Sequence, residues 1–216
     1  AALSSFWLIA VKAWRDPLAE GAHFMTMSTY KSLGGPAGGL IVTNDPDIAQ
    51  SLDAIAFPGM TANFDAAKSA ALAVTMLDWR DHGKAYAAQM IDVSMKLAEA
   101  LHGLGLPVFA AEQGFTRSHQ FAIEAARFGG GQAMSQAIRK AGFLACGIGL
   151  PLPEIAGDMN GLRIGTPELV RWGVGPEHVE RLATLIASAI RSDRPETLLA
   201  ETSAFRQEFD RLHYIS

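Results

Sequence analysis

The sequence predicts an α/β fold, because short stretches typical of strands alternate with helical stretches along most of its 216 residues. Hydrophobic residues make up 49% of the chain and charged residues 19%, so enough apolar material is present for a buried core. A long helical pattern from Ala66 to about Leu101 exceeds what one compact domain usually needs, and suits a helix that crosses between two domains. We therefore place a domain boundary near residue 90.

The first elements are expected to include two short strands. Residues 1–14 are apolar and fit either a helix or a buried strand. Residues 23–29 and 40–43 are rich in β-compatible side chains, and a glycine-rich turn at 34–39 separates them. This pattern predicts two strands connected through the turn.

Helices are predicted next. Asp45-Pro46 indicates a helix that runs to about Ala54, because aspartate caps helix N-termini and proline suits the first helical turn. Phe57-Pro58-Gly59 predicts a turn. After it, Asn63 or Asp65 is expected to cap the long helix.

The remainder of the chain alternates between the two kinds of element. We expect strands at 108–110, 120–124, 143–146 and 162–164, and helices at 130–141, 176–191 and 196–212. This interleaving supports an α/β arrangement in the second domain as well.

Composition excludes several classes of function. The net charge of -4 and a pI near 5.9 argue against a nucleic-acid partner or an anionic membrane surface. No apolar run is long enough to span a bilayer, and residues 1–11 lack the basic region of a signal peptide. The lone Cys146 cannot form an internal disulfide, so we expect a cytoplasmic protein. The histidines show no metal-ligand spacing, and no metal is expected.

One lysine has surroundings suited to chemistry. Lys31 follows a predicted strand, has hydroxyls at Ser28, Thr29 and Ser32, and precedes the glycine-rich turn. Schiff-base chemistry needs an amine taken out of bulk water, and hydroxyls can bind a phosphate. By the residues alone, a solvated surface lysine is the commoner outcome. A Walker phosphate loop is excluded, since the lysine precedes the glycines.

Three motifs together resemble the serine hydroxymethyltransferase family. Residues 27–39 resemble its pyridoxal-phosphate (PLP) lysine motif, in which a threonine-rich strand runs into the lysine and a Gly-Pro-x-Gly-Gly turn. Phe57-Pro58-Gly59 resembles its Phe-Pro-Gly segment, and residues 161–167 resemble its Arg-Ile-Gly-Thr-Pro motif. The order is the same, and the resemblance covers nearly all of this chain but only the second half of a family member.

The resemblance implies a fold-type-I PLP enzyme. Residues 1–90 would be the C-terminal part of a large, mostly parallel PLP-binding domain with the interdomain helix, and residues 91–216 a smaller C-terminal α/β domain. The implied reaction interconverts serine, or an α-substituted serine, and a glycine-type amino acid, with tetrahydrofolate as co-substrate. A threonine aldolase or an aminotransferase would share these features, and a catalytically incomplete scaffold subunit is a further alternative. A homodimer is implied, because such sites are built across a dimer interface.

The same resemblance assigns roles to five residues. Lys31 would be the catalytic residue that holds PLP as an imine, with Ser28, Tyr30 and Gly59 also at the cofactor. Arg163 would bind the substrate carboxylate, for which its planar guanidinium is suited. By the residues alone, a buried Arg163 paired with an internal Asp or Glu is the commoner arrangement.

The chain also departs from the family pattern. Tyr30 stands where a histidine usually precedes the lysine, and His119, which matches a histidine that the family tends to have, is expected to serve in packing. The carboxylate partner of the PLP ring and a nearby histidine would fall at Ala1 and Ser4, which cannot do that work. The chain is therefore expected to be a fragment, a split subunit with a complementary N-terminal half, or a non-catalytic relative, and we favour a fragment.

Overall fold

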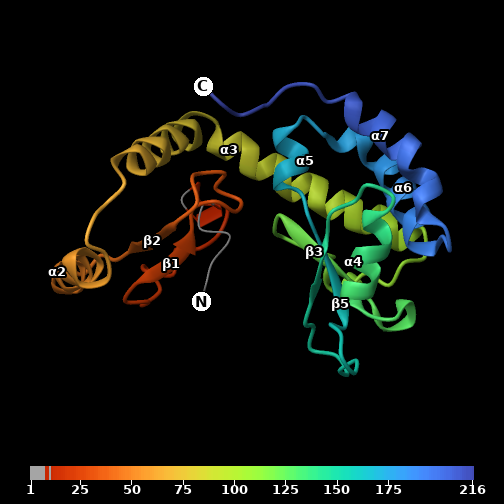
Figure 1. The fold of residues 1–216 in the computed structure, drawn as a ribbon, viewed down its shortest axis with the longest axis horizontal. Coiled ribbons are helices and arrows are strands. Elements are labelled where there is room, and N and C mark those ends of the chain that lie inside the picture. The colour runs from red at the N-terminus through yellow and green to blue at the C-terminus, as the bar shows by residue number, and fades with distance from the viewer. Residues whose placement is uncertain (1–7, 10) are drawn as a thin grey trace. The chain divides into compact units, whose positions relative to one another are not determined.

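The computed structural model describes residues 8–9 and 11–216, and these form two compact units (Figure 1). The first unit comprises the described residues up to Ala87 together with Tyr214–Ser216, and the second comprises Ala88–His213. Ala1 and Ser4 lie outside the described residues, as does most of the apolar stretch at 1–14. Among the helices described, none is both long and apolar enough to cross a membrane.

The first unit contains the predicted pair of strands. β1 (Met25–Ser28) and β2 (Gly39–Val42) run antiparallel, with Met25 opposite Val42 and Ser28 opposite Gly39. Side chains alternate along β1, so Met25 and Met27 are buried and pack in a cluster with Ile9. The two strands are confirmed, whereas the mostly parallel sheet expected of a large PLP domain is not found in the described residues of this unit.

The helices of the first unit begin at the predicted caps. α2 (Pro46–Ala54) starts after Asp45, whose carboxylate accepts hydrogen bonds from the next backbone N–H groups. The predicted turn at 57–59 lies inside a short helical segment, η1 (Ile55–Met60), which is broken at Phe57 by an extended backbone. α3 (Ala66–Gly103) is capped by Asp65, whose Oδ1 accepts from the backbone N–H of Lys68 at 3.0 Å.

A three-stranded antiparallel sheet forms the centre of the second unit. Its order is β3 (Gln120–Glu124), β5 (Gly161–Gly165) and β4 (Cys146–Ile148), so β5 is the central strand. α4 (Gly131–Arg139) and α6 (Val179–Arg191) contact each other, and α4 also contacts β5. Apolar side chains of β5 and of the second half of α3 are fully buried and supply the core: Met90, Val93, Leu97, Leu101 and Leu162.

Shorter elements connect this core. They are η2 (Ala111–Gln113), η3 (Ala126–Phe128), α5 (Pro167–Arg171), η4 (Pro176–His178), η5 (Pro195–Leu198) and α7 (Leu199–Gln207). The predicted strand at 108–110 is wrong, because only Val108 forms a bridge and Ala110 has a left-handed φ of 57°. The strand predicted at 143–146 begins only at Cys146, and the last helix ends at Gln207 rather than 212.

Candidate functional site

Lys31 lies in a turn that its own backbone closes tightly, here called the lysine turn (residues 29–38). The backbone N–H of Thr29 donates to Gly38 O at 3.0 Å, and the N–H of Gly35 donates back to Thr29 O at 2.9 Å. The N–H of Gly34 donates to Lys31 O at 2.8 Å. The hydroxyl of Thr29, whose residue is 2% exposed, donates to Pro36 O at 2.5 Å. These bonds pair several polar groups of the turn with one another.

The side chain of Lys31 is exposed at the rim of this turn. Its ammonium has neither an ion-pair nor a hydrogen-bond partner among the described residues. The dry environment that Schiff-base chemistry needs is therefore not provided by the described part of the first unit. An exposed amine on an ordered turn fits PLP as a covalent anchor, because the cofactor's aldehyde can reach it.

The other predicted cofactor residues also belong to the first unit. Ser28 is half-buried at the end of β1, next to the lysine turn, and Tyr30 within the turn is 56% exposed. Gly59 lies in η1, where an added Cβ would come within 2.9 Å of Ala54 O. A larger residue at this position would therefore fit only if the chain shifted. Ser28, Tyr30 and Lys31 are thus neighbours, and Gly59 lies in a separate segment.

Arg163 occupies the middle of the central strand in the second unit. It lies opposite Ala122 on β3 and Cys146 on β4. Leu162 and Ile164 point into the core, so Arg163 points to the other face of the sheet and is exposed. No carboxylate pairs with its guanidinium in the described part of the chain, so the interpretation as a buried structural ion pair is wrong. Small neighbours leave the planar group accessible for two-point binding of a carboxylate.

His119 is the buried neighbour of this arginine, at the start of β3. Its carbonyl accepts from Thr166 N at 2.9 Å and from Thr166 Oγ1 at 3.2 Å, and that hydroxyl also donates to Met90 O on α3 at 2.8 Å. Burial, and to a smaller extent the positive charge of Arg163, lower the pKa of His119 to about 4. The imidazole is therefore neutral near pH 7, and its Nδ1 has no hydrogen-bond partner among the described residues.

The structure brings these predicted residues into two groups. Lys31, Ser28 and Tyr30 form one in the first unit, and Arg163 and His119 form the other in the second unit. The packing expected of His119 is confirmed, since it is 5% exposed, but its electrostatic link to Arg163 was missed. No cluster of three or more metal-ligating side chains occurs within the described residues.

The chain thus has an α/β fold that presents a lysine on a hydrogen-bonded turn and an arginine on an exposed sheet face. A family model described as serine hydroxymethyltransferase matches residues 4–186, and the chain belongs to this family. The predicted family and fold class are thereby confirmed, and the family implies PLP as cofactor.

Known relatives match the chain over nearly its whole length. Alpha-methylserine aldolases from a Ralstonia species and from Variovorax paradoxus are 60% and 56% identical over 96% of this chain, covering 48% and 47% of their own length. A serine hydroxymethyltransferase from Methanopyrus kandleri is 36% identical over 96% of this chain and 49% of its own. The chain therefore spans about half the length of the relatives it matches.

A solved structure has the same fold. The L-threonine transaldolase from Pseudomonas fluorescens, determined in its internal aldimine state, superposes with a TM-score of 0.83 at 25% sequence identity. The match covers 97% of this chain and 48% of the transaldolase.

Proposed function

We propose that the enzyme containing this chain cleaves and forms the bond between Cα and the hydroxymethyl group of serine-type amino acids, with α-methylserine as its favoured substrate. The observation that carries the proposal is the exposed guanidinium of Arg163, which no carboxylate neutralises among the described residues. Such a group is suited to the carboxylate of an amino acid. The choice of α-methylserine rests on the aldolase relatives that are 54% to 60% identical to this chain.

Arg163 binds and orients the substrate in this proposal. Two parallel hydrogen bonds to the carboxylate prevent free rotation of the amino acid, so the arginine fixes which bond at Cα is presented for cleavage. The neutral state of His119 beside it keeps a second positive charge away, so the carboxylate meets one guanidinium with a defined geometry. The small residue Ala122, opposite Arg163, leaves room for the substrate on that face of the sheet.

Lys31 holds the cofactor, with the hydroxyls of Ser28 and Tyr30 as hydrogen-bond partners of its phosphate and the Gly59 backbone as a further contact. Bound PLP supplies an electron sink for the amino group of the substrate. During cleavage the Cα–C bond breaks, the hydroxyl group loses its proton, and formaldehyde leaves. Cα then gains a proton, which gives alanine from α-methylserine or glycine from serine. The freed amine of Lys31 is a group that can carry such a proton.

A second candidate is hydroxymethyl transfer to tetrahydrofolate. The Methanopyrus kandleri relative, a serine hydroxymethyltransferase at 36% identity, favours it. The two reactions share the cleaved bond and differ in the acceptor of the one-carbon unit. In either case we propose a homodimer, as the family resemblance implies, and a cytoplasmic location, as the lone Cys146 suggests.

The test uses a joined enzyme, in which this chain replaces the matched 209-residue segment of the Ralstonia aldolase. With PLP present, we expect formaldehyde and alanine from α-methylserine without tetrahydrofolate, and the unmodified Ralstonia enzyme is the control. Conversion of serine to glycine that requires tetrahydrofolate would instead establish the second candidate. A well-folded joined enzyme that cleaves neither substrate would overturn the proposal.

A further inference from the structure

One face of α3 lies against the lysine turn within the first unit. Lys68, Leu72, Thr75 and Trp79 follow the spacing of one helical face. A Cβ on Gly35 would lie 3.4 Å from Leu72 Cδ1 and 3.5 Å from Thr75 Oγ1. The turn therefore lies close enough to the helix that a methyl group at position 35 would contact it.

Trp79 links this helix to the lysine turn through a hydrogen bond. Its indole Nε1 donates to Leu33 O at 2.8 Å, and Trp79 and Leu33 are only 4% and 1% exposed. Leu33 lies between Lys31 and Gly34, whose backbones are themselves hydrogen-bonded. The indole N–H thus fixes the part of the turn that presents the amine of Lys31.

The position of the Trp79 ring is itself determined by its neighbours. The ring of Tyr86, two turns further along the same helical face, lies 5.2 Å from it at an interplanar angle of 51°. A Cβ on Gly83 would come within 2.6 Å of Trp79 Cε3 and 3.1 Å of Val11 Cγ1. Only glycine at position 83 therefore leaves room for the indole in this orientation.

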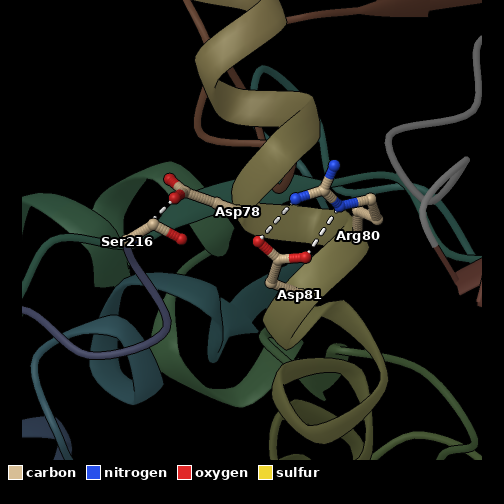
Figure 2. A network of polar contacts seen from close by, with 4 residues as sticks. All are labelled: Asp78, Arg80, Asp81 and Ser216. Atoms are coloured by element: carbon tan, nitrogen blue, oxygen red, sulfur yellow. Dashed lines mark hydrogen bonds and ion pairs between the residues drawn. The ribbon is translucent and has the colours of Figure 1, made fainter.

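The C-terminal tail (residues 214–216) extends this aromatic contact. The ring of Tyr214 stacks on Tyr86 with centroids 5.1 Å apart and an interplanar angle of 24°. The backbone N–H of Ser216 donates to Asp78 Oδ1 at 2.8 Å, one residue before Trp79 (Figure 2). The adjacent Arg80–Asp81 ion pair in that view is exposed and contributes little to holding the tail.

We infer that Trp79 is a positioning residue for Lys31, and that Tyr214 supports it through Tyr86. This inference rests on the proposed role of Lys31 as the cofactor lysine. The tail then acts on the site by ordering the lysine turn.

The test compares Trp79→Phe with Trp172→Phe in the joined enzyme. Both changes keep an aromatic ring and remove an indole N–H, but the Nε1 of Trp172 donates to Glu168 in the second unit. We expect Trp79→Phe to increase amide hydrogen exchange at Gly34 and Gly35 about tenfold, because one buried hydrogen bond is lost. The rate at which borohydride traps PLP on Lys31, located by peptide mass spectrometry, is expected to fall by a similar factor. Trp172→Phe is expected to leave both readouts unchanged.

A second pair of variants tests the tail with less risk to the fold. Tyr214→Ala removes the stacked ring, and Tyr214→Phe retains it. We expect the alanine variant to raise exchange in the turn about threefold and the phenylalanine variant to match the wild type. Exchange in the turn that stays at the wild-type rate in both Trp79→Phe and Tyr214→Ala would overturn the inference. If exchange rises as expected but PLP is never trapped on Lys31, even in the wild type, the positioning role holds and the proposed function fails.

Discussion

The lysine turn and the strand that carries Arg163, here called the arginine strand (β5, Gly161–Gly165), present similar groups in different ways. Lys31 and Arg163 are both long, exposed cations without an ion-pair partner among the described residues. Arg163 lies on a strand that is paired on both edges, so the main chain of the sheet determines its place. Lys31 lies in a turn that depends on an indole from another element.

This difference predicts how each site responds to substitution. A strand paired on both sides keeps its backbone when one side chain changes, so changes there should alter chemistry alone. A turn supported by side chains from a helix should move when its support changes, so the position of the amine should be sensitive to distant residues. Substitutions at the two sites should therefore differ in how far their effects spread from the changed side chain.

Lys31→Ala should have the largest effect. Loss of the amine removes the covalent anchor, so we expect activity of the joined enzyme to fall at least about 10³-fold and the borohydride-trapped PLP adduct to disappear. The exposed Lys140 is the matched control, and Lys140→Ala should keep both properties. An unchanged adduct in Lys31→Ala would show that another lysine holds the cofactor.

His119 should make the fold sensitive to acid in the second unit. Its pKa is about 4 in the folded state, against 6.5 for an ordinary histidine, so the unfolded chain binds a proton that the folded chain does not. The free energy of unfolding should therefore be unaffected by His119 above pH 6.5 and fall by about 3 kcal/mol as the pH drops to about 4. Urea unfolding at neutral pH and near pH 4 should show this fall in the free energy of unfolding in the wild type but not in His119→Gln. An equal fall in the two proteins would contradict the burial of a neutral imidazole.

Arg163→Lys should separate binding from stability. Lysine keeps the charge but loses the planar fork, so we expect KM for the amino acid to rise about 30-fold. The free energy of unfolding should change by less than about 0.5 kcal/mol, because the side chain is exposed. Arg139→Lys on α4, which is also exposed, is the control for both measurements. A large loss of stability without a change in KM would assign Arg163 to the structure alone.

Local sequence signals predicted many of the elements well. The cap at Asp45 placed α2, and the strand expected at 120–124 has the bounds of β3, because both predictions depend on residues within or next to the element. The strand expected at 108–110 was wrong, since Ala110 adopts a left-handed conformation that its residue type does not indicate.

The candidate site was predictable only in part for the same reason. Lys31 and Arg163 stand in short motifs that can be read directly. The link of His119 to Arg163 depends on the pairing of β3 with β5, and the bond from Trp79 to Leu33 joins residues 46 positions apart. Neither contact leaves a local pattern.

Two buried threonines allow the contrast to be tested with one small change. Thr29 in the lysine turn donates to Pro36 O, and Thr166 after β5 donates to Met90 O and His119 O. Thr→Val keeps the shape and removes the donor, so each variant should lose about 1–2 kcal/mol in the free energy of unfolding. Thr29→Val should also slow PLP trapping on Lys31 about threefold, by the loss of order in its turn.

Thr166→Val should leave KM within about twofold of the wild type, because the ladders on both sides of β5 hold Arg163 in place without that hydroxyl. Denaturation, trapping rates and steady-state kinetics on the same two proteins measure these effects. An increase in KM of about threefold in Thr166→Val would equal the slowing of PLP trapping expected in Thr29→Val. The arginine strand would then depend on side-chain support as much as the lysine turn does. The contrast between a site placed by a sheet and a site placed by a helix face would then be lost.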